Sequence, residues 1–328
     1  MYVITGGAGF LGSNLAAGIE EREMGEITIV DRFSNDNRWR NIAKRSLREI
    51  VFPENVFEYL DRHAGRIDAV VHINYTGFVQ ENDVDALIED RIHLTWRLWS
   101  WCAHHQVPFV YDSTAGVYGD GSLGFKDDDS AEGLAKLKPL SAAAWTKLFL
   151  DRKIVDTINR GETVPPQWIG LRCFNLYGPN EYHGSRHQSV VPRIYNAAKN
   201  GKLFPLFKSD NPAYKDGEQM RDFMWIDDAV DIILWMLRHP EISGFFNIGT
   251  GQARTYADVL RAVYAAVGEK PEMDFMELPA EMKEQYQYFT QADIQKLRAA
   301  GYAKPFTSLE DGVSKYIHDY LESADPYR

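Results

Sequence analysis

The stretch Val3-Ile4-Thr5-Gly6-Gly7-Ala8-Gly9-Phe10-Leu11-Gly12-Ser13 decides the fold of this chain. It runs from a short apolar strand through a glycine-rich turn into an amphipathic helix, which leads to a second strand that ends at Asp31. A strand, a glycine loop, a helix and a carboxylate in this order form a dinucleotide-binding βαβ unit. The sequence therefore predicts an α/β fold with a doubly wound parallel sheet of the Rossmann type.

Each part of this unit has a physical role in holding a dinucleotide. Gly6 and Gly9 let the backbone turn tightly beside a pyrophosphate, and Gly12 lets the helix lie close to the strand. The helix start offers unpaired N–H groups and a positive dipole end to the phosphates, while Asp31 can accept hydrogen bonds from ribose hydroxyls. The cofactor contacts expected here are Gly6, Gly9, Phe10, Leu11, Gly12 and Asp31.

Basic residues follow Asp31, and they bear on the choice of cofactor. Arg32, Arg38 and Arg40 can meet the 2′-phosphate of NADP, or they can form a solvated helix face. Both interpretations stay open. NADP and NAD are therefore both candidate cofactors, with NADP preferred, and Arg32 and Arg38 join the expected cofactor contacts.

Composition and charge limit the possible partners and the compartment. The formal net charge of −11 argues against nucleic acid or an anionic membrane, since both bind basic surfaces. Two cysteines in 328 residues indicate a reducing compartment, and no apolar run approaches the ~20 residues of a membrane span. We therefore expect a cytoplasmic protein. Neither His104 nor His105 has a partner at a convincing ligand spacing, so no metal site is predicted.

Further apolar runs predict the rest of the sheet and its helices. A buried strand at 67–73 precedes a long helix at about 83–104, and the strand 107–111 ends in Asp112, Ser113 and Thr114. Ligands of doubly wound sheets bind outside such carboxyl ends. A helix at about 142–159 then carries Lys147.

The pattern of strands, helices and loops along the sequence divides the chain into two parts. Residues 1–179 are expected to form the dinucleotide-binding domain, to which the chain returns at about 222–250. Residues 180–221 and 251–328 are expected to form a smaller substrate-binding lobe. The acidic run 127–129, in a loop-like stretch, is expected to be solvated.

Several blocks of the sequence together resemble the extended short-chain dehydrogenase/reductase family of nucleotide-sugar epimerases and dehydratases. They occur in that family's order and span nearly the whole chain. The blocks are Thr5-Gly6-Gly7-Ala8-Gly9-Phe10-Leu11-Gly12, Ser113-Thr114-Ala115-Gly116-Val117-Tyr118-Gly119, Arg172-Cys173-Phe174-Asn175-Leu176-Tyr177-Gly178-Pro179, Arg221-Asp222-Phe223 with Asp227-Asp228, and Phe246-Asn247-Ile248-Gly249-Thr250-Gly251.

Three more stretches resemble the branch of that family that epimerises nucleotide-activated heptoses at C6. They are Trp39-Arg40-Asn41-Ile42, Tyr177-Gly178-Pro179-Asn180-Glu181-Tyr182-His183, and Gln287-Tyr288-Phe289-Thr290-Gln291-Ala292-Asp293 with Leu297-Arg298-Ala299-Ala300-Gly301-Tyr302.

The resemblance implies a redox epimerase, which removes a hydride from the sugar C6 onto bound NAD(P) and returns it to the other face of the ketone. In that family a Tyr-x-x-x-Lys pair supports the reaction. The tyrosine acts as acid and base, and the lysine, here Lys147, binds the nicotinamide ribose. Thr114 would share the substrate oxygen, and Phe174 would lie near the cofactor.

The chain departs from the family pattern where the tyrosine should stand. The residue four before Lys147 is Ala143, whose methyl group cannot move a proton. Asp112 replaces a small residue, Arg91 replaces an asparagine, and Gly184 stands where the heptose branch carries a lysine. The loop 74–80 also differs from the family's small, hydroxyl-rich loop.

These departures leave three hypotheses open. The chain is an epimerase of this lineage with impaired or altered activity, a protein that binds cofactor without redox chemistry, or a scaffold rebuilt for different chemistry. In the last case Lys147 could act as an amine nucleophile, or Asp112 and His187 as a proton-transfer pair.

The resemblance also implies a nucleotide-sugar ligand and a homo-oligomer. The substrate contacts expected from the family positions are Asn175, His183, Arg186, Arg221 and Tyr286.

Overall fold

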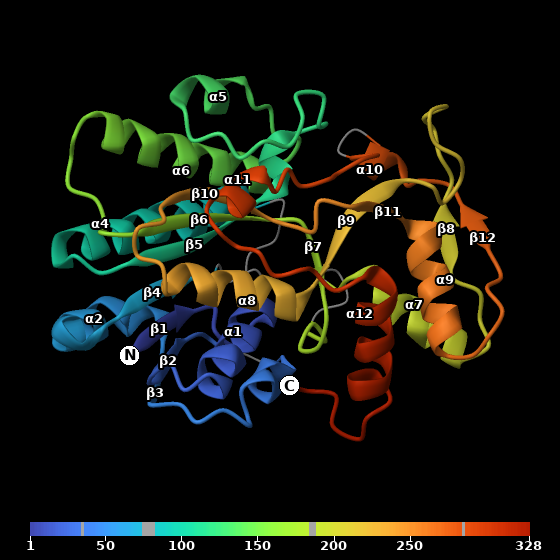
Figure 1. Ribbon diagram of the computed structural model, residues 1–328, viewed down its shortest axis with the longest axis horizontal. Helices are drawn as coiled ribbons and strands as arrows, with labels where there is room; N and C mark the ends of the chain where they lie inside the picture. Colours follow the sequence, from blue (N-terminus) through green and yellow to red (C-terminus); the bar gives the residue numbers. More distant parts are fainter. Residues whose placement is uncertain (34–35, 74–82, 184–187, 284–285) are drawn as a thin grey trace.

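A computed structural model describes residues 1–33, 36–73, 83–183, 188–283 and 286–328. Its largest sheet holds seven strands in the order β10-β6-β5-β4-β1-β2-β3, and every neighbouring pair is parallel. Figure 1 shows this sheet between two layers of helices, which confirms the doubly wound α/β fold. The strands are β1 Tyr2–Thr5, β2 Ile27–Val30, β3 Glu49–Val51, β4 Ala69–His72, β5 Phe109–Thr114, β6 Trp168–Cys173 and β10 Gly244–Ile248.

The order of the strands reverses at β1, where the glycine loop begins. From β1 the chain runs outward through β2 and β3, then crosses back to β4 on the other side. This arrangement opens a crevice outside the carboxyl ends of β1 and β4, which is where such sheets bind ligands.

Helices cover both faces of the sheet because each buries an apolar stripe against it. Helices α1 Phe10–Glu21 and α8 Ile226–Leu237 pack on one face, with Leu15, Ile19 and Ile233 in its core. The other face is covered by α2 Val56–His63, α4 Thr95–His105 and α6 Ala142–Asn159.

The long helix predicted at about 83–104 is present but contains an irregular turn. It consists of α3 Val84–Ile88, a π-helical turn over Glu89–Leu94, and α4. The turn carries Asp90 and buries Arg91. Such turns occur often at functional sites.

Smaller elements form the end of the molecule farthest from β3 (Figure 1). A three-stranded sheet has the order β11-β9-β7, and β8 pairs with β12. The bounds are β7 Asn175–Tyr177, β8 Pro205–Phe207, β9 Met220–Trp225, β11 Ala253–Thr255, β12 Asp274–Met276, α7 Val190–Lys199, α9 Tyr256–Ala266 and α12 Leu309–Lys315. The remaining short helices are α5 Ala131–Lys136, α10 Ala280–Lys283 and α11 Gln295–Ala299. The proposed domain boundaries stay a prediction.

The acidic run 127–129 is not solvated throughout, and this prediction was wrong for Asp127, which is buried. Its Oδ2 accepts a hydrogen bond from the backbone N–H of Asn247 at 3.0 Å, and Asp129 accepts one from Phe245. Both donors lie on β10, the edge strand of the large sheet. The carboxylates satisfy edge N–H groups that no neighbouring strand pairs.

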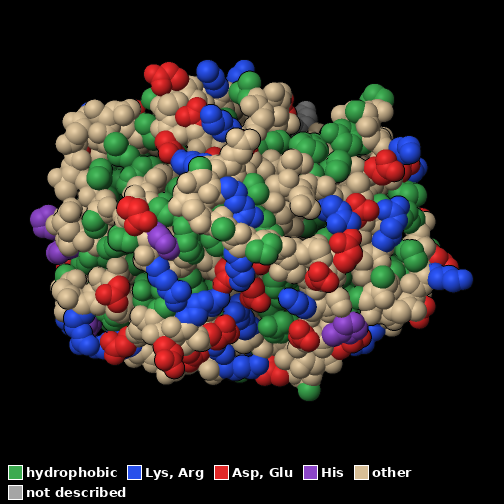
Figure 2. Space-filling view, in the orientation of Figure 1, with side chains coloured by type: hydrophobic (Ala, Val, Ile, Leu, Met, Phe, Trp, Pro, Cys, Tyr) green, Lys and Arg blue, Asp and Glu red, His purple; other side chains and the backbone are tan. Residues whose placement is uncertain are grey.

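Within the described part of the chain, no helix is both long and apolar enough to cross a membrane. Figure 2 shows acidic and basic side chains interspersed over the visible face, without a single extended basic patch.

Candidate functional site

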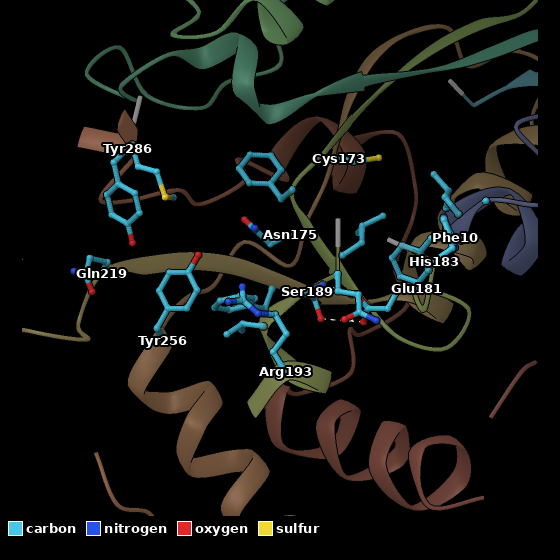
Figure 3. A pocket seen from close by; sticks show the side chains of 18 of the residues that line it. Phe10, Cys173, Asn175, Glu181, His183, Ser189, Arg193, Gln219, Tyr256 and Tyr286 are labelled. Carbon is cyan, nitrogen blue, oxygen red and sulfur yellow. Dashed lines mark hydrogen bonds between the residues drawn. The ribbon is translucent and has the colours of Figure 1, made fainter. Parts of the chain in front are cut away.

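A cavity of about 670 Å³ opens at the carboxyl ends of the central strands. At one end its wall contains Gly6, Gly9, Phe10 and Leu11, and at the other Tyr256 and Tyr286. Figure 3 shows this span, with Phe10 and His183 on one side and the two tyrosines on the other. Its length suits an extended ligand, or two ligands lying end to end.

The glycine loop has the geometry that a dinucleotide requires. Gly6 has a φ of 61°, a conformation that side chains disfavour. A Cβ on Gly12 would collide with the carbonyl oxygen of Gly6 and lie 2.7 Å from the Cα of Gly7. Gly12 itself does not line the cavity, so its role is the close approach of α1 to the loop, as predicted. The residues therefore fit a dinucleotide cofactor.

Asp31 is fully buried directly after β2, and its carboxylate contacts the backbone of the glycine loop. Its Oδ2 accepts a hydrogen bond from the N–H of Ala8 at 2.8 Å, and its Oδ1 accepts one from Arg32 at 2.7 Å. Burial raises the pKa of this carboxyl, and the guanidinium of Arg38 opposes that effect. Asp31 thus holds the loop in shape before any ribose is bound.

The arginines that follow behave differently from one another. Arg38 is 2% exposed, lines the cavity and forms ion pairs with Asp31 and Asp36. Arg32 and Arg40 are exposed, and Arg32 pairs with Glu54 on the surface. Arg38 is therefore the arginine that the structure brings to the cavity, and the other two form the solvated face.

Helix α6 positions Lys147 through two anchors. The hydroxyl of Ser141 accepts a hydrogen bond from the N–H of Ala144 and caps the helix start. One turn after Lys147, the buried Asp151 accepts hydrogen bonds from Tyr111 at 2.8 Å and from Ser113 at 3.2 Å. These contacts fasten α6 to β5, so Lys147 projects toward the carboxyl end of that strand.

At that strand end Lys147 meets Asp112. Its Nζ donates to the Asp112 carbonyl oxygen and lies 2.9 Å from Asp112 Oδ1. Ala143 stands one turn earlier on α6, so its methyl group offers no phenol beside the ammonium. Thr114 lies on the same strand, and its hydroxyl accepts a hydrogen bond from the N–H of Gly116 at 3.1 Å. Asp112 and Ser113 line the cavity, whereas Thr114 and Lys147 lie behind its wall.

Two more charges from the π-helical turn surround this pair. Burial raises the pKa of Asp90 to about 6, and the charges of Lys147 and Arg91 act against that rise. Within the described structure, Asp90 Oδ2 and Arg91 Nε are buried without a hydrogen-bond partner. Burial also lowers the pKa of Lys147, which the carboxylate of Asp112 counteracts. We refer to Asp90, Arg91, Asp112 and Lys147 as the four-charge cluster.

His72 is buried in the core, and both of its ring nitrogens have hydrogen-bond partners. Its ring nitrogens bond to Thr5 at 2.6 Å and to Thr95 at 2.8 Å. Burial and the charge of Lys147 lower the pKa of His72 to about 3, so the ring is neutral near pH 7.

The expected substrate contacts are only partly at the cavity. Asn175, His183 and Tyr286 line it, as does the expected cofactor contact Phe174. Arg221 is buried behind the wall, where its guanidinium lies 5.3 Å from the ring centre of Tyr286. Arg186 and His187, and with them the hypothesis of an Asp112–His187 pair, lie outside the described residues.

Several lining residues were missed by reasoning from the sequence. Arg193, Gln219 and Tyr256 line the cavity and come from α7, from just before β9 and from α9. Figure 3 shows the side chains of Arg193 and Tyr256 extending into it. The buried Glu181 accepts hydrogen bonds from Gly178 and Ser189. Glu181 stood within one of the blocks that match the family. Nothing local in the sequence indicated that Arg193, Gln219 and Tyr256 would meet at one cavity.

Comparison with known proteins agrees with this geometry. The profile of the NAD dependent epimerase/dehydratase family matches residues 2–249. ADP-L-glycero-D-manno-heptose-6-epimerase from Fusobacterium nucleatum is 39% identical over 335 residues, covering 100% of both chains. The protein of that name from Nitratidesulfovibrio vulgaris is 37% identical over 330 residues, again covering 100% of both.

Solved structures share the fold. The Helicobacter pylori ADP-L-glycero-D-manno-heptose-6-epimerase superposes with a TM-score of 0.77 at 24% identity, over 96% of this chain and 94% of that one. Thermus thermophilus UDP-glucose 4-epimerase in complex with NAD gives 0.74 at 23% identity, over 98% and 99%. The chain therefore belongs to the NAD-dependent epimerase/dehydratase family and is, by lineage, a nucleotide-sugar epimerase.

Proposed function

We propose that this protein binds NADP, or less favourably NAD, together with a nucleotide sugar of the ADP-heptose type, and that its C6 epimerase chemistry is impaired or altered. The proposal includes a cytoplasmic location and a homo-oligomeric assembly, which follow from the sequence and the family resemblance. It also assigns the substrate to the lobe formed by 180–221 and 251–328.

One observation carries the proposal. The glycine loop and Asp112 line the cavity, and Lys147 lies behind its wall in an ion pair with Asp112, while Ala143 offers no hydroxyl. In the family the lysine would bind the nicotinamide ribose and activate a tyrosine. Here the ammonium pairs with the carboxylate of Asp112 instead, so the scaffold of the family carries a different acid–base group.

When bound, the nicotinamide supplies the hydride acceptor and donor. The residues of this chain supply the rest of the site. Gly6, Gly9 and the start of α1 hold the diphosphate, and Arg38 offers a buried guanidinium near the ribose end. Asn175 and His183 orient the sugar, and the aromatic residues at the far end pack against the nucleotide.

Binding is tested separately from turnover. Mass spectrometry of the purified protein should find NADP or NAD carried through purification. Thermal unfolding with added NADP and ADP-heptose should show stabilisation that follows RT ln(1 + [L]/Kd), about 2.7 kcal/mol when the ligand is at 100 times its Kd. If neither ligand changes the melting temperature, the proposal is wrong.

The altered site is tested by Ala143→Tyr, with epimerisation of ADP-heptose followed by NMR. A phenol one turn before Lys147 should raise the epimerisation rate by on the order of 10-fold or more, because positioned acid–base groups contribute about 10²–10⁴-fold. Ala143→Phe, which fills the same space without a hydroxyl, is the matched control. An equal rate in all three proteins would show that the missing tyrosine does not limit the reaction.

A second candidate function, amine chemistry at Lys147, has one observation in its favour, since burial lowers the pKa of this lysine. The ion pair with Asp112 opposes it by stabilising the ammonium. Borohydride trapping of a carbonyl compound on Lys147 would support this candidate, and the absence of an adduct across a panel of aldehydes and ketones would remove it.

A further inference from the structure

The cavity wall contains two carboxylates among the described residues, and they differ in their surroundings. Glu181 is held within its own loop, where its oxygens accept hydrogen bonds from the N–H groups of Gly178 and Ser189 and from the Ser189 hydroxyl. Asp112 lies instead at the tip of β5, with 17% of its side chain exposed and Lys147 at 2.9 Å. Asp112 is therefore the cavity carboxylate that contacts the lysine of the altered motif.

We infer that Asp112 is the proton-transfer residue of this cavity, in place of the tyrosine absent at 143. This inference rests on the proposed function. In the oxidising half-reaction Asp112 would accept the proton as the O–H bond of the substrate hydroxyl breaks. The bound nicotinamide would supply the acceptor for the hydride that leaves the carbon bearing that hydroxyl. The reducing half-reaction returns the proton and the hydride to the substrate, so neither Asp112 nor the cofactor is consumed.

Three other titratable groups of the wall suit this role less well. Tyr256 and Tyr286 lie at the end of the cavity away from Phe10 (Figure 3), and burial raises the pKa of Tyr286 further. Cys173 pairs in register with Thr114 beside Asp112, but burial raises the pKa of its thiol to about 12. The thiol therefore stays protonated near neutral pH and is a poor base.

The other members of the four-charge cluster surround the pair of Asp112 and Lys147. Lys147 supplies a direct counter-charge to Asp112, while Arg91 and Asp90 act with opposite signs on Lys147. Asp90 is thus a positioning residue, because its negative charge favours the ammonium form of Lys147, which contacts Asp112. Among the described residues, the titratable and charged groups facing this region include His72 from β4, Asp90 and Arg91 from the π-helical turn, Lys147 from α6 and Cys173 from β6.

The main test compares Asp112→Asn and Asp112→Glu with the unmodified enzyme in ADP-heptose epimerisation. Asp112→Asn should lower kcat by on the order of 100-fold or more, with the Kd values for NADP and ADP-heptose changed less than 3-fold. Asp112→Glu should recover part of the rate, because it keeps the carboxylate. Asp85→Asn is the matched control, since Asp85 is exposed on α3, and it should leave kcat unchanged.

The role of Asp90 is tested by a pH profile. In Asp90→Asn the midpoint of the pH-dependent labelling of Lys147 by acetic anhydride should move to lower pH, because the negative charge of Asp90 favours the ammonium form of Lys147. A drop in kcat with an unchanged labelling midpoint would assign Asp90 a structural role only.

A measurement that does not depend on turnover tests the ion pair between Asp112 and Lys147 directly. Acetylation of Lys147 by acetic anhydride is followed by peptide mass spectrometry across pH in the ligand-free protein. Loss of the paired carboxylate in Asp112→Asn should shift the midpoint of labelling to lower pH, while Asp85→Asn leaves it in place. An unchanged midpoint in Asp112→Asn would contradict the pairing on which the inference depends.

The outcomes separate this inference from the proposed function. If both ligands bind and the enzyme turns over, but Asp112→Asn keeps kcat within 3-fold, Asp112 is not the proton-transfer residue. If both ligands bind and the unmodified protein shows no turnover, the inference fails while the proposal of an impaired epimerase stands. If neither ligand binds, the proposed function itself fails.

Discussion

A single buried guanidinium illustrates how one residue bears on cofactor choice. Arg38 donates to Asp36 Oδ2 at 2.7 Å and to the carbonyl oxygen of Arg32 at 2.7 Å, and it lies 3.4 Å from Asp31 Oδ1. It lines the cavity while making these contacts. A guanidinium held in this way is already oriented, so binding a phosphate there costs little side-chain entropy.

We expect Arg38→Ala to raise the Kd for NADP by on the order of 10-fold and the Kd for NAD by much less, because only NADP carries the 2′-phosphate. Both constants can be measured by calorimetry. Arg32→Ala is the control, since Arg32 is exposed and pairs with Glu54 at the surface. An equal change in both constants would mean that Arg38 serves to hold Asp31 rather than a phosphate.

At the scale of elements, the contact between α1 and the glycine loop decides whether the dinucleotide site can form. The side of α1 at Gly12 lies directly against the backbone of Gly6 and Gly7. The backbone cannot move aside as a flexible side chain would, so any added atom displaces the helix or the loop.

Gly12→Ala should therefore lower the free energy of unfolding by about 1–3 kcal/mol, the usual cost of overpacking, and weaken NADP binding at the same time. Urea unfolding and calorimetry measure the two effects. Gly65→Ala is the matched control, because a Cβ there meets no atom within 4 Å. Similar losses in both variants would point to a general effect of alanine rather than to this contact.

The π-helical turn is the other element that matters to the site. A π turn adds one residue to a helical turn, so every later side chain rotates relative to the regular pattern. Reading 83–104 as one regular helix predicted its extent well. It could not predict that Asp90 and Arg91 would lie near Lys147, because that depends on where the extra residue is inserted.

Across the whole molecule, buried carboxyl groups make stability depend on pH. Burial raises the pKa of Glu181 to about 7 from an ordinary value of 4.5. A carboxyl whose pKa is higher in the folded state binds its proton more tightly there, so it stabilises the fold most at low pH. Its contribution is present below about pH 4.5 and is lost as the pH rises through 7.

Compared with Glu181→Gln, the unmodified protein should therefore lose on the order of 1–3 kcal/mol of unfolding free energy between pH 4.5 and pH 7. Urea titrations at several pH values measure the difference between the two proteins. Both proteins contain the other carboxyl groups, including Asp90, so the contribution of those groups to the pH dependence drops out of the difference. Parallel curves for the two proteins would show that Glu181 is charged in the folded state.

The amino-acid sequence by itself determined the features that depend on local order. The glycine spacing, the apolar strands and the position of Lys147 predicted the doubly wound sheet and its dinucleotide loop, and the residue four before Lys147 identified Ala143 as a departure. These features were readable because turn geometry and periodic burial are set by neighbours in the chain.

Only the tertiary structure decided which charges meet. It placed Asp112 against Lys147, brought Asp90 and Arg91 to the same pair, buried Arg38 while leaving Arg32 exposed, and buried Asp127 of the acidic run 127–129. Each outcome depends on desolvation and on contacts between residues far apart in the chain, which no local pattern records.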